Sequence, residues 1–374
     1  MKPRVLFVGR TRYRLPLPSW LERKWEAVGH ELDYRVLASA ADGVRSSGRF
    51  ELISPASFAD GIAFYTRLPF RVRRAIRTFR PEAIVAEDPR TATLVMVGRR
   101  LAGGPRAKVI CEVHGDWRHS TRLYGTGGRR LLSPFVDVLD RYGVRHADAV
   151  RALSLYTATL VKEERGELPD AVFPTYTDLS VFTERPVRPL PETPTALFVG
   201  VLERYKNVDG LVVAWRRVAD RVADARLVVV GKGPLRVEVD RLAAELQDRV
   251  EVIDELAPEG VASALDDATL LVLPSRHEGL GRVVIEAFAR GRGVVASRAG
   301  GVLDLVDDGV QGLLVDPEDT AGLSDALVTV LGQRDVAQRL GAAASARFAE
   351  WNQTADEFAA RTKELVDAAL NSRS

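Results

Sequence analysis

Cysteine is almost absent from the sequence, with one residue among 374, and methionine occurs only twice. A single cysteine cannot form an intrachain disulfide, so a disulfide-stabilised secreted scaffold is excluded and we expect a reducing, cytoplasmic location. Cys111 lies within the apolar run Lys108–Val113, which indicates a buried structural thiol and not a reactive one.

Long hydrophobic runs are lacking as well. No stretch approaches the roughly 20 apolar residues that cross a bilayer as a helix. The short apolar run near the N-terminus is followed at once by Arg10, Arg12 and Arg14, unlike a secretory signal. We therefore expect any contact with a membrane to be peripheral.

Neither sign of charge dominates the whole chain, whose formal net charge is +2, but its two halves differ. Residues 1–185 contain 31 Lys and Arg against 21 Asp and Glu, whereas residues 186–374 contain 22 against 30, giving +10 and −8. The basic half either has an anionic partner or carries a solvated basic surface. We expect no nucleic-acid partner.

The length of the chain exceeds what one hydrophobic core usually serves, which predicts two domains. Short β-branched runs alternate with amphipathic segments, the pattern of βα units on a parallel sheet. The proline-rich residues 173–194 indicate a linker between two such series. The expected strands are 4–8, 34–37, 83–86, 108–113, 149–152, 196–199, 226–230, 250–253, 270–273, 293–296 and 312–315.

Two helices are predicted from their end signals. Ser19 followed by Glu22 predicts a capping box that opens the first helix, and Gly29 predicts its end. Residues 354–370 form a long amphipathic pattern at the other end of the chain.

The segment 64–80 combines aromatic residues and prolines with six arginines. Val72, Ala75, Ile76 and Phe79 recur there at helical spacing. This composition is typical of a basic interfacial helix on an anionic membrane. It fits equally a packed helix whose apolar stripe faces the domain core and whose arginines are solvated.

Residues 270–291 read as a strand, a loop and a helix in close succession, with Glu278 and Glu286 separated by seven residues. Gly279 and Gly281 let backbone N–H groups approach a ligand, and the helix directs its positive end at the same place, which suits a diphosphate. The two carboxylates suit two hydroxyl-rich sugars. Taken alone, they also fit a solvated helix residue and a loop carboxylate.

These residues resemble the Glu-x7-Glu motif of the family-4 glycosyltransferases of the GT-B superfamily, with Leu280 in the position of the family's phenylalanine. The resemblance extends over nearly the whole chain. It implies an α/β fold of the GT-B type, with two Rossmann-like doubly wound domains facing a central cleft. Residues 1–180 would form the acceptor-binding domain, with a C-terminal helix of about 354–374 crossing back to it, and residues 181–353 would bind the nucleotide sugar.

By this resemblance Glu278 would bind hydroxyls of the donor sugar and Glu286 those of the ribose. Residues 198–208 resemble the family's Gly-Arg-Leu-x-x-x-Lys phosphate loop, in which Gly200 and Lys206 match. Val201 stands where the family has arginine, so we expect Arg204 to supply the missing charge.

Two further glycine-containing segments resemble the family. Residues 231–234 match its Gly-x-Gly-Pro turn, which either contacts the nucleotide or is a tight turn before a helix. Residues 297–301 match its later glycine loop, where we expect packing near the donor, with Asp304 beginning the next helix.

In the N-terminal half, a His-Gly-Asp stretch follows a predicted strand, at the end where open α/β sheets bind ligands. We expect His114 to hydrogen-bond a sugar hydroxyl, and Arg10 and Asp116 to contact the acceptor. The pair Glu87-Asp88 either lies on the same side or caps a helix.

The resemblance implies a retaining, metal-independent glycosyltransferase with Glu278, His114 and Lys206 as its catalytic residues. The nucleotide sugar would be a substrate, and we expect neither a cofactor nor a metal. The acceptor would bear a hydroxyl group and be lipid-linked, a glycan or a natural product. Two alternatives stay open, a nucleotide-sugar epimerase of similar fold and a noncatalytic nucleotide-sugar-binding protein.

Overall fold

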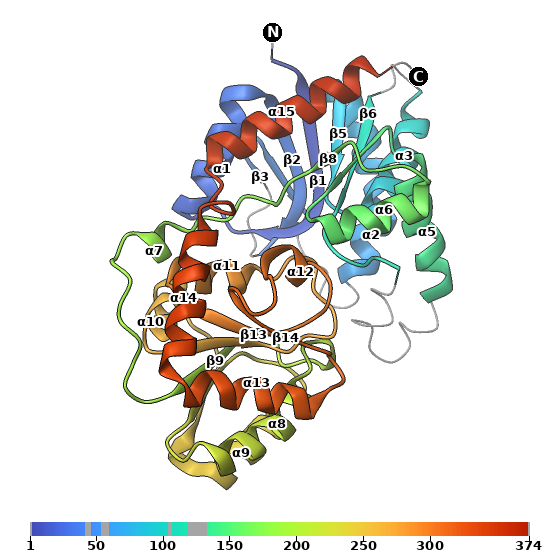
Figure 1. Ribbon diagram of the computed structural model, residues 1–374. Coiled ribbons are helices and arrows are strands. Elements are labelled where there is room, and N and C mark those ends of the chain that lie inside the picture. Colours follow the sequence, from blue (N-terminus) through green and yellow to red (C-terminus); the bar gives the residue numbers. More distant parts are fainter. Residues whose placement is uncertain (1, 42–45, 54–59, 104–106, 119–132, 373–374) are drawn as a thin grey trace. The chain divides into compact units, whose positions relative to one another are not determined.

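The computed structural model describes residues 2–41, 46–53, 60–103, 107–118 and 133–372. The chain divides into two compact units, one of residues 1–178 with 353–374 and one of residues 179–352. Each unit is a mainly parallel β-sheet with helices packed against it (Figure 1). No helix in the described ranges is long and apolar enough to cross a membrane.

The sheet of the first unit has eight strands in the order β3-β4-β2-β1-β5-β6-β7-β8, and β3 alone of the described strands pairs antiparallel. Its strands are β1 (Arg4–Tyr13), β2 (Asp33–Ala40), β3 (Ser46–Ser47), β4 (Phe50–Ile53), β5 (Ala83–Ala86), β6 (Lys108–Val113), β7 (Ala149–Ala152) and β8 (Ala171–Val172). Its helices are α1 (Ser19–Glu31), α2 (Asp60–Phe79), α3 (Pro89–Ala102), α5 (Ser133–His146), α6 (Leu155–Arg165) and α15 (Ala355–Asn371). β5, β6 and β7 have the predicted bounds.

The first strand is longer than predicted. β1 continues from Val8 to Tyr13 because, after an irregularity between Val8 and Arg12, it pairs again with the last residues of β2. Arg10 and its neighbours are therefore part of a strand and not of a loop.

The predicted capping box of the first helix was wrong. Pro18 is the N-cap of α1 and no side chain caps the helix, because Ser19 is already its first helical residue. The helix also passes Gly29 and ends at Glu31, where Leu32 N donates to the carbonyl of Val28.

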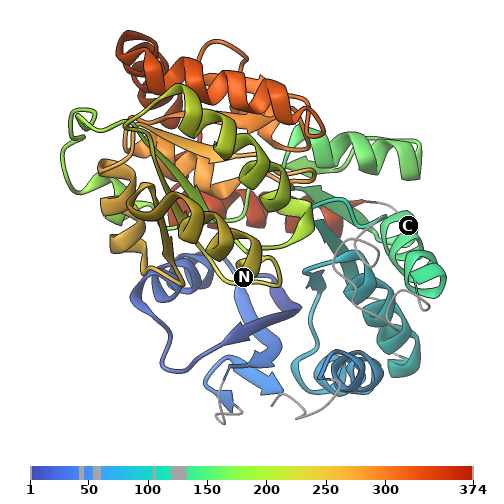
Figure 2. The same ribbon diagram turned by 90° about the horizontal axis from the view of Figure 1, so that it is seen from below.

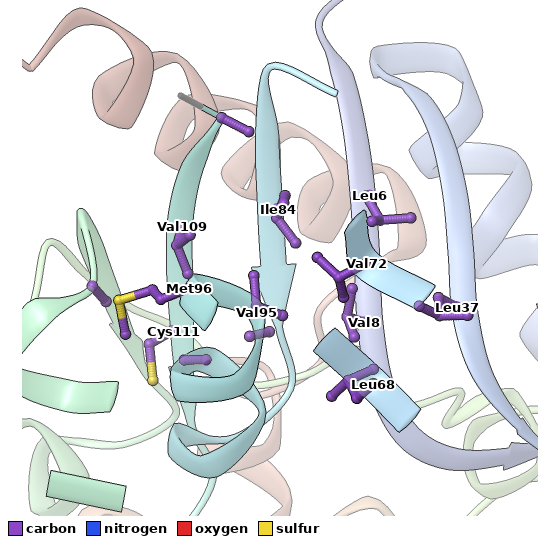
Figure 3. Close-up of a cluster of buried hydrophobic side chains, with 14 of the residues drawn as sticks. Leu6, Val8, Leu37, Leu68, Val72, Ile84, Val95, Met96, Val109 and Cys111 are labelled. Atoms are coloured by element: carbon purple, nitrogen blue, oxygen red, sulfur yellow. The ribbon is translucent and has the colours of Figure 1, made fainter. Parts of the chain in front are cut away.

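The apolar stripe of α2 faces the core of the first unit. Leu68 and Val72 are fully buried, and they point toward Val8 of β1 in the close-up of Figure 3. Ala75, Ile76 and Phe79 are buried with them, and Figure 2 shows the helix nearly along its axis. The interfacial reading of this stripe was therefore wrong, since its side chains already pack in the domain core.

The sheet of the second unit is parallel, with the strand order β11-β10-β9-β12-β13-β14. Its strands are β9 (Thr195–Val199), β10 (Arg226–Val230), β11 (Val250–Ile253), β12 (Leu270–Leu273), β13 (Gly293–Ser297) and β14 (Gly312–Val315). Its α-helices are α7 (Ser180–Thr183), α8 (Val208–Arg221), α9 (Arg236–Leu246), α10 (Pro258–Asp266), α11 (Arg282–Ala289), α12 (Val302–Leu305), α13 (Thr320–Gly332) and α14 (Arg334–Phe348), with 3₁₀ turns η2 (Arg204–Lys206) and η3 (Gln247–Arg249). All six strands were predicted within one residue at each end.

Two buried arginines at the end of α11 hold the proline-rich segment against the second unit. Arg290 Nη1 donates to two carbonyls of this segment at 3.0 and 2.8 Å, and its Nη2 lies 2.6 Å from Asp266 Oδ1. Arg292 Nη1 donates to the carbonyl of Arg188 at 3.0 Å, and its Nη2 to that of Pro189 at 3.2 Å. Much of the predicted linker is thus an ordered part of the second unit.

The last helix, α15, packs in the first unit although it follows the second in sequence. Its buried residues Phe358, Leu365 and Val366 share a core with α1 and the sheet. Thr354 and Glu357 form a capping box at its start, with the Thr354 side chain accepting from Glu357 N at 3.1 Å. The apolar side of the amphipathic pattern of 354–370 therefore packs against α1 and the first sheet, far away in sequence.

Candidate functional site

The strand order of the second sheet creates a switch point beside β9. From β9 the chain crosses to β10 on one side, and it later returns to β12 on the other side. Ligands of open α/β sheets bind at such points, outside the carboxyl ends of the strands. The loop after β9 contains Gly200–Lys206 and the loop after β12 contains Ser275–Gly281, so the two predicted donor segments meet here.

An ion pair joins these two loops. Lys206 Nζ lies 2.5 Å from Glu278 Oε1, and the same oxygen accepts from Ser275 Oγ at 2.8 Å. The side chains of Lys206 and Glu278 are only 14% and 10% exposed. Water screens a buried pair less than an exposed one, so this attraction holds the cation and the carboxylate together.

Arg276 fixes the loop that carries Lys206, a role that the sequence did not reveal. Its backbone N donates to the carbonyl of Tyr205 at 2.7 Å, and its Nη1 donates to that of Arg204 at 2.7 Å. Its guanidinium also pairs with Asp209 at 3.0 Å and Glu318 at 2.7 Å. Such contacts join residues more than 40 positions apart, which local patterns do not show.

Glycines permit the backbone of residues 297–301 to touch the Glu278 loop. A Cβ on Gly300 would lie 2.0 Å from the carbonyl oxygen of Glu278, and one on Gly301 would lie 2.1 Å from that of Gly279. Gly301 N donates to the Glu278 carbonyl at 3.0 Å. This segment packs against the loop, and the helix after it begins at Val302, ahead of the predicted start at Asp304.

The Gly-x-Gly-Pro turn is explained by a similar close approach. A Cβ on Gly231 would lie 1.9 Å from the carbonyl oxygen of Gly200, and one on Gly233 would lie 2.5 Å from that of Leu202. Leu202 N donates to the carbonyl of Lys232 at 2.8 Å. These glycines therefore position the phosphate-loop segment through backbone packing.

Glu286 lies on α11, which begins after Gly281 in the left-handed conformation. The residue is 7% exposed, and its Oε1 accepts from Arg282 Nε at 2.8 Å. Burial raises the pKa of Glu286, and the nearby Arg282 guanidinium only partly opposes this. A carboxylate offers about four acceptor positions, so Glu286 retains capacity for ligand hydroxyls.

Arg204 and Val201 occupy exposed positions in the loop after β9. The Arg204 side chain has no hydrogen-bond or ion-pair partner in the described part of the chain, while its carbonyl accepts from Arg276. The guanidinium is therefore available for an anion, as the proposed replacement of the family's arginine requires.

A second switch point lies in the first unit, between β1 and β5. A cavity of about 470 Å³ there is lined by Arg10, Thr11, Arg12, Tyr65, Glu87, Asp88 and His114. Glu87 Oε2 accepts from Thr11 N at 3.0 Å, which ties the two strand ends together. Asp88 also caps α3 by accepting from Thr91 N at 2.9 Å, so both readings of the Glu87-Asp88 pair apply.

His114 is held by a partly buried carboxylate that the sequence did not indicate. Glu112 Oε2 lies 3.2 Å from His114 Nε2, and Glu112 Oε1 lies 3.0 Å from the buried Arg151. Burial alone would raise the pKa of Glu112, but Arg151, His114 and Lys24 outweigh it and lower this pKa to about 2. The imidazole therefore faces a permanently charged partner.

Asp116 is placed differently from His114 and Arg10. Its Oδ1 accepts from the backbone N of Arg118 at 3.0 Å and from its Nε at 3.2 Å. Of the three residues, Arg10 and His114 line the cavity at β1 and β5, whereas Asp116 is not among its lining residues.

Two family descriptions match this chain. The "Glycosyl transferase 4-like domain" matches residues 19–174, and "Glycosyl transferases group 1" matches residues 193–333. Together the two matches take in most of the chain. The protein belongs to the GT-B glycosyltransferases of the GT4 type.

Curated relatives match the chain in part. The alpha-D-kanosaminyltransferase of Streptomyces kanamyceticus is 28% identical over 257 residues, which are 64% of this chain and 65% of that protein. The D-inositol 3-phosphate glycosyltransferase of Nocardia farcinica is 37% identical over 178 residues, 44% of this chain and 39% of that protein. Each match thus spans less than two thirds of the relative's length.

Solved structures resemble the chain over nearly its full length. Sucrose-phosphate synthase from Thermosynechococcus elongatus has a TM-score of 0.77 at 19% identity, covering 98% of this chain and 99% of its own. Anabaena HepE, solved in complex with UDP and glucose, has a TM-score of 0.73 at 18% identity, covering 97% of this chain and 99% of its own. At these identities the likeness shows the shared fold.

Replacing Gly300 by alanine is expected to destabilise the second unit by about 2–5 kcal/mol, because a left-handed residue with a Cβ costs about 1–2 kcal/mol and overpacking costs about 1–3 more. Gly309→Ala shares the positive φ but has open space, and Gly332→Ala has neither problem. Urea unfolding of the three variants should give Gly300→Ala the largest loss and Gly332→Ala the smallest. Equal losses for Gly300→Ala and Gly309→Ala would show that the loop contact contributes nothing.

Replacing Glu112 by glutamine should remove stability in a pH-dependent way. Because the folded pKa of Glu112 is lowered from 4.5 to about 2, its charge stabilises the fold fully above about pH 5 and loses this effect as the pH falls toward 2. At 1.36 kcal/mol per pKa unit the effect is about 3 kcal/mol at pH 7. The stability difference between wild type and Glu112→Gln, from urea unfolding, should therefore shrink by about half or more at pH 3. The exposed Glu22→Gln is the control, and a difference that is unchanged between pH 7 and pH 3 would contradict the assignment.

Proposed function

We propose that this protein is a retaining glycosyltransferase that moves a sugar from a nucleotide-diphosphate sugar to a hydroxyl-bearing acceptor. The observation that carries the proposal is the Lys206–Glu278 pair at the switch point of the second sheet, with Glu286 on the helix that follows. A cation, a carboxylate and a helix N-terminus at one strand edge match the phosphate, hydroxyl and ribose groups of such a donor.

In the proposed complex the donor diphosphate lies between Lys206 and the start of α11. Lys206 supplies a positive charge, and the backbone N–H groups around Gly279–Gly281 supply donors at the positive end of the helix. The diphosphate then replaces Glu278 as the partner of Lys206, and Glu278 turns to hydroxyls of the donor sugar. Glu286 lies about 6 Å along the axis of α11 from its first residue, Arg282, so it addresses a different part of the donor from Glu278, the ribose.

The proposed chemistry is attack on the same face of the sugar from which the diphosphate departs. The departing phosphate oxygen accepts the acceptor's hydroxyl proton, while Lys206, Arg204 and the α11 N-terminus stabilise the developing charge. Because these groups supply positive charge, we propose that transfer needs no metal and no cofactor. His114, held by Glu112, would bind a hydroxyl of the transferred sugar.

The relatives support a nucleotide sugar as the donor and leave the base open. HepE was solved with UDP and glucose, and the curated relatives are named as glycosyltransferases. We therefore propose UDP-sugars as the first donors to test, beside GDP-, ADP- and dTDP-sugars. A thermal-shift screen identifies the donor class, since a ligand at 100 times its Kd stabilises by about 2.7 kcal/mol.

Peripheral contact with an anionic membrane is a further part of the proposal. It is supported by Ile62 and Phe70 on the exposed side of α2, which are 62% and 64% exposed beside Arg73 and Arg77. Flotation with vesicles of phosphatidylcholine, with and without phosphatidylglycerol, should recover the protein only with the anionic lipid and only at low salt. Reversing Arg73, Arg74 and Arg77 to glutamate should abolish recovery, and equal recovery with neutral vesicles would contradict membrane contact.

Substitutions in the donor site should separate binding from turnover. Glu286→Ala should weaken binding of the free nucleoside diphosphate, whereas Glu278→Ala should mainly lower turnover. Lys206→Met and Arg204→Ala should each weaken diphosphate binding about 10- to 150-fold, since a charge-assisted contact contributes about 1.5–3 kcal/mol. Titration calorimetry and initial rates measure these effects, with the exposed Arg241→Ala as the control.

The proposal fails if Glu286→Ala and Lys206→Met bind nucleoside diphosphate as tightly as wild type and still transfer sugar. The Arg204→Ala variant tests only whether Arg204 contacts the diphosphate. Unchanged binding and rates in Arg204→Ala would leave Lys206 and the backbone N–H groups as the only phosphate contacts.

A further inference from the structure

A second cavity of the first unit has five arginines among its eleven lining residues. It has a volume of about 550 Å³ and is lined by residues of α2 and of the strands β2 and β4. Its charged lining residues are Arg35, Arg49, Glu51, Arg67, Arg71 and Arg74. It shares no lining residue with the cavity at His114, so it is a separate feature of the unit.

The arginines converge because of strand and helix periodicity. Arg35 alternates with buried residues on β2 and lies on the same sheet face as Leu37, which packs in the core under α2. Arg67, Arg71 and Arg74 are spaced by four and three residues along α2, which places them along one side of the helix. The sheet and the helix therefore present guanidinium groups to one space.

The positive charge of this cavity is largely uncompensated. Glu51 is its one acidic lining residue, and its Oε1 lies 3.3 Å from Arg71 Nη1. The side chains of Arg67 and Arg74 have no hydrogen-bond or ion-pair partner in the described ranges. The four guanidinium groups of Arg35, Arg67, Arg71 and Arg74 repel one another with one carboxylate between them, and a bound anion would relieve that repulsion.

An aromatic ring orients one of the arginines. The Arg35 guanidinium lies over the ring of Phe79, 4.8 Å from its centroid. The Arg49 guanidinium instead lies 4.6 Å from the ring centroid of Tyr34, on the side of the sheet that α1 covers. A guanidinium that is held against a ring keeps N–H donors for phosphate oxygens, so part of the entropy cost of ordering the Arg35 side chain has already been met.

We propose that this cavity is a binding site for a ligand bearing two or more phosphate groups, distinct from the donor site of the second unit. Arginine in place of lysine favours bidentate contacts with phosphate oxygens. Several guanidiniums in one cavity favour a multiply charged group over a single carboxylate. The phosphates belong either to a soluble molecule or to a lipid headgroup, which share this chemistry.

Calorimetry with inorganic pyrophosphate and tripolyphosphate tests the site in the full-length protein. The Lys206→Met background weakens the expected phosphate site of the second unit, so failure of this proposal differs from failure of the donor assignment. In that background Arg67→Gln/Arg74→Gln should weaken tripolyphosphate binding at least 30-fold. The control Arg73→Gln/Arg77→Gln removes the same charge from the same helix outside this cavity, and it should change binding less than 3-fold.

Arginine modification gives a direct readout of the site. Tripolyphosphate should protect Arg67, Arg71 and Arg74 from phenylglyoxal, measured by mass spectrometry of peptides, and leave Arg73 reactive in the same sample. Binding should weaken steeply with added salt.

Vesicles containing phosphatidic acid or a phosphoinositide separate the two sources. Binding of soluble polyphosphate that is lost in Arg67→Gln/Arg74→Gln identifies a soluble ligand. Binding to such vesicles alone, lost in the same variant and retained in Arg216→Gln/Arg241→Gln, which removes the same charge from the second unit, identifies a lipid headgroup. No binding of either probe, or equal loss of tripolyphosphate binding in Arg67→Gln/Arg74→Gln and Arg73→Gln/Arg77→Gln, would overturn the proposal.

Discussion

The close contact of glycine backbones at the carboxyl edge of the second sheet is the constraint on which the candidate donor site depends. Gly231 lies against the carbonyl of Gly200, and Gly300 lies against that of Glu278. Any side chain at either position would push two loops apart by more than an ångström, since its Cβ would meet a carbonyl oxygen at about 2 Å. The loops that carry Lys206 and Glu278 are thereby fixed before their side chains interact.

The order of the parallel strands brings the loops of each candidate site together. In both units the first strand of the series has its successor on one side and a later strand on the other, so two loops diverge at a switch point. In the second unit these loops bring together a lysine and a glutamate, which form a largely buried ion pair. In the first unit they bring Arg10, Glu87 and His114 to one cavity. The same topology therefore explains both candidate sites.

The sequence predicted the regular parts of the fold because buried parallel strands are short, apolar and rich in β-branched residues. β10, β11, β12 and β14 have the predicted bounds. The strands β3 and β8 were missed because they are the two edge strands of the first sheet and only two residues long, too short for a periodic pattern. The four-residue β4, which lies next to β3, was missed as well. The capping box at Ser19 was predicted wrongly because a serine occurs both as the N-cap and as the first residue of a helix. Only the backbone angles distinguish the two positions.

The site residues that the sequence did not predict are those whose contacts are with residues far away in the chain. The motif around Glu278 was visible because its residues are adjacent in the chain. Arg276 and Glu112 went unrecognised because their partners lie on other elements, more than 35 residues away for the Glu112–Arg151 pair. The apolar stripe of α2 gave two readings for the same reason, since amphipathic helices on membranes and on domain cores share one pattern.

Backbone amide hydrogen exchange with and without a nucleoside diphosphate tests the central claim most directly. The diphosphate should be the one among UDP, GDP, ADP and dTDP that binds most tightly. The account predicts slower exchange in peptides covering residues 199–206 and 278–286, because their N–H groups and side chains hold the diphosphate and the ribose. Unchanged exchange in both segments at saturating nucleotide, with protection confined to residues 1–178, would contradict it.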